Sequence, residues 1–173
     1  MDDIVIRSML KWPDVPDVFG WLRLDRRGNW RLRSEEPAAG DGFGPIGNAA
    51  FREFIARNYA ADEQGRWFFQ NGPQRVFVQL AYAPFVFRAE KASFVDQCGQ
   101  ASSLLQGAWV DEEGSLLLKV SGKVGLLDDR DLAEMADGVE DGFVRLGAAR
   151  VDVASLKSTE TEGFFVFVRD PKP

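Results

Sequence analysis

Residues 65–87 decide the fold of this chain, and they read Gly-Arg-Trp-Phe-Phe-Gln-Asn-Gly-Pro-Gln-Arg-Val-Phe-Val-Gln-Leu-Ala-Tyr-Ala-Pro-Phe-Val-Phe. Aromatic and branched residues flank a polar turn at residues 71–75 (Asn-Gly-Pro-Gln-Arg). Because Gly-Pro reverses a chain, the pattern predicts strands over residues 66–70, 75–80 and 85–89. These strands are predicted to form the core of one domain.

Upstream, period-two alternation over residues 19–33 about an Asp-Arg-Arg-Gly turn at 25–28 predicts a hairpin. Trp30 is expected on its buried face, whereas Arg31 and Arg33 are expected to face water.

Three further segments are predicted before the central strands. Residues 1–17 are expected to lie extended, because the Trp-Pro-Asp-Val-Pro-Asp run at 12–17 suits neither a helix nor a central strand. Residues 34–47 are expected to form a loop. Asn48 is a good N-cap for the apolar helical stripe that follows it.

The same order of elements returns later in the chain. The echoes are an Asp-Glu-Glu-Gly turn at 111–114, a helix capped by Asp128 or Asp129, strands at 143–146 and 150–153, and Phe-Val-Phe at 165–167, which repeats residues 85–87. The sequence therefore predicts an α+β fold of duplicated antiparallel sheet-plus-helix halves. The halves are residues 18–90 and 104–173, joined by a linker at 91–103 in which Phe94 and Val95 could still add a short strand.

Composition narrows the classes of function. The 173 residues are 45% hydrophobic and 28% charged, as in soluble globular proteins. The acidic start and the lack of a run of about 18 apolar residues favour a cytoplasmic protein with no membrane partner. Residues 1–90 balance 12 Lys+Arg against 12 Asp+Glu, whereas residues 91–173 carry 9 against 15, so the net charge of −6 lies there. No DNA or RNA partner is therefore expected.

The chemistry of the chain argues against an enzyme. It contains no histidine and one cysteine, Cys98, which excludes Ser-His-Asp and Cys-His catalysis and an intrachain disulfide. The Gly-x-Gly-x-x-Gly run at 42–47 follows no predicted strand, so we interpret it as a loop. The Asp-Asp-Arg-Asp run at 128–131 suits a helix start better than calcium. Neither a metal nor another cofactor is predicted.

One polar group of residues is the candidate ligand site. Its members combine amides and guanidinium groups with aromatic faces: Arg66, Trp67, Asn71, Gln74, Arg75 and Tyr82. Guanidinium suits phosphate or carboxylate. The alternative is a purely structural turn in which these side chains satisfy the loop backbone.

The chain resembles a proteobacterial family of uncharacterised proteins. The resemblance rests on the residues at 12–16, 20–30, 54–59, 65–76 and 82–88. More loosely, the chain is similar to another bacterial family of unknown function. The similarity lies in the order of its motifs, which are Asp-x-x-Gly-x-Trp, Pro45-Ile46, a helix, Asp-Glu-x-Gly and Ala83-Pro84-Phe85. The second resemblance implies a duplicated chain, a pleckstrin-homology-like second half and a nucleotide-like ligand at the interface between the halves.

Three function classes follow. The first is a non-catalytic ligand-binding or regulatory (signalling) module that holds a small anionic, nucleotide-like ligand between the halves. Arg66 and Arg75 would supply charge, and Trp67 or Tyr82 a stacking face. The alternative is a protein-interaction module that uses the acidic second half or an open sheet edge such as residues 164–168. An enzyme that uses carboxylates without histidine is the third and least favoured class.

Overall fold

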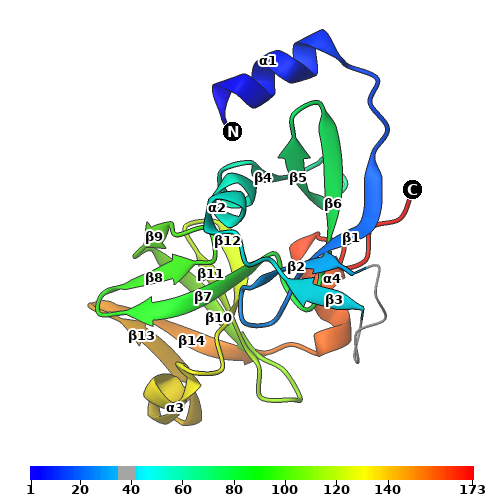
Figure 1. The fold of residues 1–173 in the computed structure, drawn as a ribbon. Coiled ribbons are helices and arrows are strands. Elements are labelled where there is room, and N and C mark those ends of the chain that lie inside the picture. The colour runs from blue at the N-terminus through cyan, green and yellow to red at the C-terminus, as the bar shows by residue number, and fades with distance from the viewer. Residues whose placement is uncertain (35–41) are drawn as a thin grey trace. The chain divides into compact units, whose positions relative to one another are not determined.

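The computed structural model describes residues 1–34 and 42–173, which fold as two compact units (Figure 1). Unit 1 consists of Met1–Asp25, Asn29–Ala81 and Phe167–Pro173, and unit 2 of Arg26–Gly28 and Tyr82–Val166. Each unit contains one large sheet and helices, so the predicted α+β class is confirmed. Part of the predicted loop, residues 35–41, lies outside the described residues.

Unit 1 is built on a sheet with the strand order β3-β2-β1-β6-β5-β4. Its elements are α1 (Asp3–Lys11), β1 (Val18–Leu24), β2 (Trp30–Arg33), β3 (Phe43–Pro45), α2 (Ala49–Arg57), β4 (Tyr59–Ala61), β5 (Trp67–Asn71) and β6 (Gln74–Leu80). Strands β1 and β6 pair in parallel, and the other neighbours pair antiparallel. The predicted hairpins are therefore present, and β3 and β4 are additions that the sequence did not predict.

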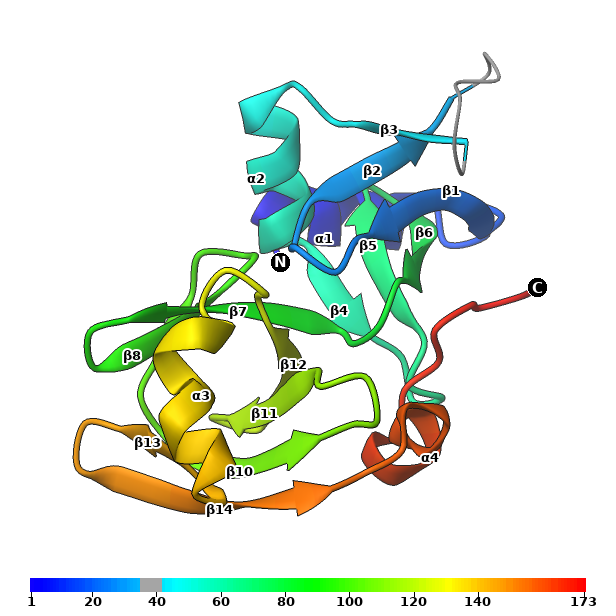
Figure 2. The same cartoon turned by 90° about the horizontal axis from the view of Figure 1, so that it is seen from below.

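Helix α2 covers one face of this sheet (Figure 2). Its predicted cap is confirmed, because the Asn48 side chain accepts a hydrogen bond from the Phe51 amide at 3.1 Å. Phe51 and Phe54 meet the ring of Phe69 edge-on, with centroids 6.0 and 5.3 Å away. Ile55 is fully buried. The α2 side is thus the apolar core of unit 1.

The N-terminal segment differs from the prediction, because residues 3–11 form helix α1 instead of lying extended. The two prolines restrict only the residues near them, and no proline lies before Pro13. Val5 is buried on one side of α1, while Ile4 and Leu10 are 74% and 81% exposed. The proline run therefore marks the end of this helix, and the prediction of an extended segment is wrong for residues 3–11.

Unit 2 is built on a sheet with the order β13-β14-β10-β11-β12-β7-β8-β9. Its elements are β7 (Phe85–Glu90), β8 (Ser93–Asp96), β9 (Ala101–Ser102), β10 (Leu105–Val110), β11 (Leu116–Val120), β12 (Lys123–Leu127), α3 (Leu132–Glu140), β13 (Phe143–Leu146), β14 (Ala149–Ser155), a 3₁₀ turn (Ser158–Glu160) and α4 (Thr161–Phe165). Strand β10 pairs in parallel with β14, and β12 with β7.

The predicted helix cap at Asp128 or Asp129 is wrong, because α3 begins at Leu132 and has no side-chain cap. Three further predictions about unit 2 are also wrong. Residues 91–103, predicted as a linker, supply β8 and β9 to the sheet. Residues 165–167 do not repeat the strand at 85–87, because α4 ends at Phe165 and Val166 adopts a left-handed conformation with φ 58°. The proposed sheet edge at 164–168 is lost for the same reason.

The duplication is visible in the topology and register of the strands. The orders β3-β2-β1-β6-β5 and β12-β11-β10-β14-β13 correspond strand for strand. Leu22 pairs with Leu32 and Val78 in the first copy, as Ala108 pairs with Leu118 and Val153 in the second. Each copy ends alike, with Ala81 donating to the Leu24 carbonyl and Leu156 to that of Val110. We call residues 18–81 the first copy and 105–156 the second.

A shared turn closes the leading hairpin of both copies. The Asp25 carboxylate accepts a hydrogen bond from the Asn29 amide, and Asp111 accepts one from Ser115, both at 2.8 Å. The fourth residue of each turn, Gly28 and Gly114, has a φ of 77° and 78°, which glycine adopts without strain. The Asp-x-x-Gly echo in the sequence therefore marks equivalent turns.

Candidate functional site

The face of the unit 1 sheet opposite α2 carries arginine side chains. Because side chains alternate along a strand, Arg23, Arg31 and Arg33 share this face with Phe77 and Phe68. Arg75 and Arg66 join it, since their guanidinium groups lie over Phe68 and Phe77 at 4.7 and 4.6 Å. We call Arg23, Arg31, Arg33, Arg66 and Arg75 the arginine face.

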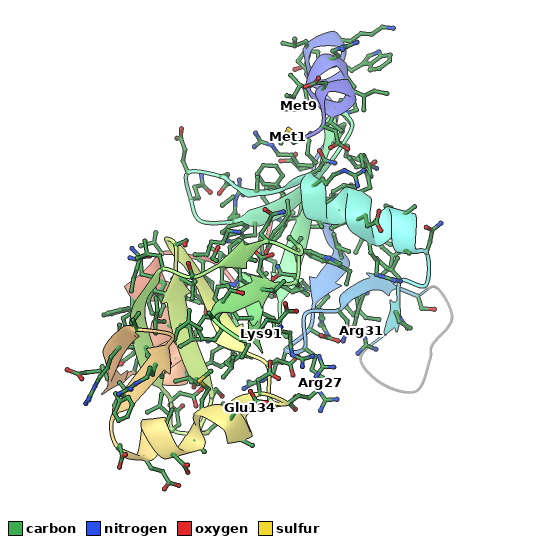
Figure 3. The ribbon with its side chains drawn as sticks, turned by 90° about the vertical axis from the view of Figure 1, so that its left-hand side faces the viewer. Met1, Met9, Arg27, Arg31, Lys91 and Glu134 are labelled. Carbon is green, nitrogen blue, oxygen red and sulfur yellow. The ribbon has the colours of Figure 1, made fainter. Side chains whose placement is uncertain are left out.

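Three of these arginines converge on Phe43 of strand β3. The guanidinium carbons of Arg23 and Arg33 lie 4.1 and 5.4 Å from the centre of the Phe43 ring. Arg31 donates to the Phe43 carbonyl at 2.5 Å, and its side chain can be followed from β2 in Figure 3. Arg33 donates to the Gly20 carbonyl at 2.7 Å. Aromatic faces and carbonyl oxygens thus fix the positions of these guanidinium groups.

The arrangement places like charges side by side. Arg23 and Arg31 are direct cross-strand partners, and such a pair is unfavourable unless something of opposite charge lies near. Concentrated guanidinium groups with fixed geometry are suited to bind phosphate or carboxylate oxygens in pairs.

The second copy serves as an internal comparison for this face. The register places Trp109 where the first copy has Arg23, Leu117 in place of Arg31, and Lys119 in place of Arg33. Leu117 is fully buried in an apolar cluster. Trp109 packs on Phe165 of α4, with ring centroids 4.9 Å apart. The same scaffold position is therefore an ordinary apolar core in one copy and an arginine cluster in the other.

Two predicted site residues, Arg66 and Arg75, lie on the arginine face. Arg66 is committed to Asp62, since its Nε donates to the carboxylate at 2.8 Å. Desolvation raises the pKa of Asp62, but the bonds from Arg66 outweigh it and leave that pKa below its ordinary value. The guanidinium of Arg75 makes no hydrogen bond or ion pair with any of the residues that the structure describes. Arg75 is therefore the better candidate for an added contact.

The other predicted residues of unit 1 lie on the opposite side of the sheet. Trp67, Asn71 and Gln74 share the face of Phe69, which α2 covers. Trp67 packs on Tyr59 at 4.7 Å, and Gln74 donates to the Pro16 carbonyl at 3.0 Å. The structure therefore places Trp67, Asn71 and Gln74 on the face of the sheet opposite Arg75.

Tyr82, the sixth predicted residue, belongs to unit 2 and is 3% exposed. Its hydroxyl donates to the Asp111 carboxylate, and the Arg26 guanidinium covers its ring at 4.5 Å. Both its polar tip and one aromatic face are thus engaged within unit 2. Whether any of the six predicted residues contacts a ligand stays a prediction.

Unit 2 has a surface hollow of about 410 Å³ at the carboxyl ends of β10 and β14. It is lined by Val110, Asp111, Glu112, Ser155, Leu156, Lys157 and Glu160. The Ser158 hydroxyl and amide donate to the Glu112 carboxylate and lower its pKa to about 2. Three carboxylates against one lysine make this hollow unsuited to an anion.

The thiol of Cys98 in unit 2 is poorly suited to act as a nucleophile. Burial raises the pKa of its thiol to about 12, with a further contribution from the Asp96 carboxylate. A thiol that stays protonated at neutral pH is a poor nucleophile.

Sequence reasoning missed the Arg23–Arg31–Arg33 cluster although a signal was present. Arg31 and Arg33 occupy alternate positions of the second strand of the first hairpin, and Arg23 lies opposite Arg31 on the first strand, which puts all three side chains on one face. Arg31 and Arg33 were expected merely to face water. The missing information was β3, which brings Phe43 beside them.

Comparison with known proteins places the chain among uncharacterised families. A family model named DUF2944, described as "Protein of unknown function (DUF2946)", matches residues 1–172. A DUF1285 family protein from Silicibacter pomeroyi DSS-3 is similar, with a TM-score of 0.54 and 17% identity over 80% of this chain and 82% of that one. A DUF1285 family protein from Shewanella baltica OS155 has a TM-score of 0.46 and 16% identity over 67% of this chain and 90% of that one.

At this level of identity the Silicibacter likeness shows the fold alone. A search of curated proteins found no match. Among the described residues, no helix is long and apolar enough to cross a membrane.

Proposed function

We propose, for a chain that belongs to the DUF2944 family of proteins of unknown function, a non-catalytic role in binding a small anion on the arginine face. The observation that carries the proposal is the convergence of three guanidinium groups on Phe43. The second copy supports it, since the scaffold keeps its fold there with Trp109 and Leu117. The arginines are therefore not required by the architecture.

The chemical class of the ligand follows from the donors. Guanidinium groups bind phosphate and carboxylate oxygens through paired hydrogen bonds, so we expect a phosphorylated or polycarboxylate ligand, with nucleotides as one class. Arginine does not exchange its proton near neutral pH, so the face is suited to binding rather than acid–base chemistry. That the ligand lies between the halves, and that the protein is regulatory, stay predictions.

Isothermal titration with pyrophosphate, ADP and citrate tests the proposal. We expect the wild type to bind at least one of them, and Arg31→Leu and Arg33→Leu each to weaken binding about 10-fold or more, as for loss of a charge-assisted hydrogen bond. The first variant installs the residue that the second copy has. Arg7→Leu on the exposed side of α1 removes the same charge elsewhere and should change little. No binding by the wild type, or an equal loss in Arg7→Leu, would overturn the proposal.

Arg75→Ala maps the extent of the site. A loss as large as that of Arg33→Leu would extend the bound ligand to the β5–β6 hairpin, whereas unchanged affinity would confine it to the Phe43 cluster. In a thermal-shift assay, ligand at 100 times its Kd should stabilise the fold by about 2.7 kcal/mol.

A second candidate function is binding of a basic protein by helix α3. Glu134 (Figure 3), Asp137 and Glu140 are exposed on this helix, and its nine residues contain no lysine or arginine. We expect salt-sensitive binding of a lysine-rich peptide that is lost when the three acids are changed to glutamine. Binding that survives this change would remove α3 from consideration.

A further inference from the structure

The segment Phe167–Pro173 is anchored to unit 1 at the edge of the arginine face. The Val168 amide donates to the Gly65 carbonyl at 3.0 Å, and the Leu80 amide donates to the Arg169 carbonyl at 2.8 Å. The Phe167 side chain is buried. These contacts fix the backbone immediately before Asp170, so the position of the Asp170 carboxylate is determined by the fold.

Asp170 connects to the arginine face through Gln79. The Gln79 side-chain amide donates to the Asp170 carboxylate at 2.7 Å, and its carbonyl lies 3.4 Å from a guanidinium nitrogen of Arg23. Lys172 contacts the other carboxylate oxygen at 2.6 Å. The Lys172 bond first, and then Gln79 and Arg23, outweigh desolvation and keep the pKa of Asp170 below its ordinary value. The group is therefore a carboxylate at neutral pH.

On the basis of the proposed function, we infer that Asp170 is a built-in counter-ion of the arginine face, with which an anionic ligand competes. Its negative charge opposes a second anion beside Arg23. It also occupies the Gln79 amide, a donor that faces the same side of the sheet as Arg23 and that a ligand oxygen could otherwise use. Ligand affinity in the wild type is then lower than the arginines alone would give.

Titration with pyrophosphate at low salt tests the inference. Asp170→Asn removes the charge but keeps an oxygen that can accept from Gln79, so the segment should stay in place. We expect this variant to bind pyrophosphate about two- to fivefold more tightly, the effect of one partly exposed charge. The gain should shrink in 0.5 M salt, because screening weakens exposed charges.

Asp14→Asn provides the control, because Asp14 is an exposed carboxylate of unit 1 outside the arginine face. An equal gain in this variant would mean that only net charge matters and would overturn the inference. Unchanged or weaker binding by Asp170→Asn would also overturn it, provided that thermal unfolding shows an intact fold. Asp170→Ala serves as a second variant if Asp170→Asn unfolds.

The two proposals fail in different ways. If no variant binds pyrophosphate, ADP or citrate, the proposed function fails and the role of Asp170 fails with it. If the wild type binds and Arg31→Leu abolishes binding while Asp170→Asn has no effect, the arginine face stands and only the counter-ion is wrong.

Discussion

Arg75 and Arg150 occupy the same position in the two copies, and each lies over the ring of a phenylalanine on the neighbouring strand. The distance is 4.7 Å from Arg75 to Phe68 and 4.0 Å from Arg150 to Phe143. In both hairpins the arginine is diagonal to the ring, with Gln70 or Arg145 directly opposite it. A contact retained in both copies contributes to folding, whatever else Arg75 does.

We therefore expect Arg75→Ala and Arg150→Ala to lower the free energy of unfolding by similar amounts, about 0.5–1 kcal/mol each, as for exposed cation–π contacts. Urea denaturation measures both values. A double-mutant cycle of Arg150→Ala with Phe143→Leu isolates the contact, and a coupling energy of zero would contradict the assignment.

The Asp111 turn is predicted to be more important for stability than its counterpart at Asp25. The Asp111 carboxylate accepts from the Ser115 and Glu113 amides and also from the buried Tyr82 hydroxyl. Asp111→Ala leaves that hydroxyl without its acceptor, so we expect a loss of about 1–3 kcal/mol. Adding Tyr82→Phe to Asp111→Ala should cost less than Tyr82→Phe alone. Additive losses in chemical denaturation would show that the two groups do not depend on each other.

Stability should fall in acid partly through Asp128. Its side chain is fully buried, and its hydrogen bonds with Arg130 outweigh desolvation and lower its pKa from 3.8 to about 2. Between these values the unfolded chain binds more protons than the folded one. Asp128 therefore stabilises the fold above about pH 4, and this contribution disappears as the pH falls towards about 2. We expect the urea midpoint to fall over this range, and less steeply in Asp128→Asn.

Glu112 titrates over the same range, because Ser158 lowers its pKa to about 2. The urea midpoint should therefore fall less steeply with decreasing pH in the double variant Asp128→Asn/Glu112→Gln than in either single variant. If the urea midpoint of the double variant fell as steeply as that of the wild type, other carboxylates would control acid unfolding.

Gly125 of strand β12 is predicted to be required for its size. A Cβ there would lie 2.6 Å from the Phe87 ring and 2.9 Å from the Phe85 Cβ, closer than carbon atoms approach in proteins. Gly125→Ala should lower stability by about 1–3 kcal/mol through overpacking. Gly163→Ala in α4 is the matched control, since nothing lies within 4 Å of its Cβ position and alanine favours helix. Equal melting temperatures for the two variants would rule out the packing argument.

Local signals in the sequence predicted the central elements well. The Gly72-Pro73 turn, the Asn48 cap and the two Asp-x-x-Gly turns each depend on a few neighbouring residues, so they survive in the structure. The match between residues 75–78 and 150–153 also holds in register, since Val78 and Val153 pair with equivalent residues. Phe-Val-Phe was misleading because three apolar residues specify burial without specifying a strand.

Other features depend on partners distant in sequence. The short strand β3 has only three residues and forms because β2 offers an open edge. The helix-capping prediction for Asp128 failed because that carboxylate binds Arg130, and α3 begins only at Leu132. Of the six predicted site residues, Arg66 and Arg75 lie on the arginine face, whereas period-two alternation places Gln74 on the other face, and their role in binding stays a prediction.

The attachment of residues 167–173 to unit 1 has a consequence for synthesis on the ribosome. The Gly65 carbonyl pairs with the amide of Val168, which is translated roughly a hundred residues later, and the Leu80 amide pairs with the carbonyl of Arg169, which follows it by roughly ninety residues. The first sheet therefore emerges with part of its border unpaired while all of unit 2 is still being made. During that interval the nascent chain is open to pairing with other strands, and translation of residues 167–169 closes the gap.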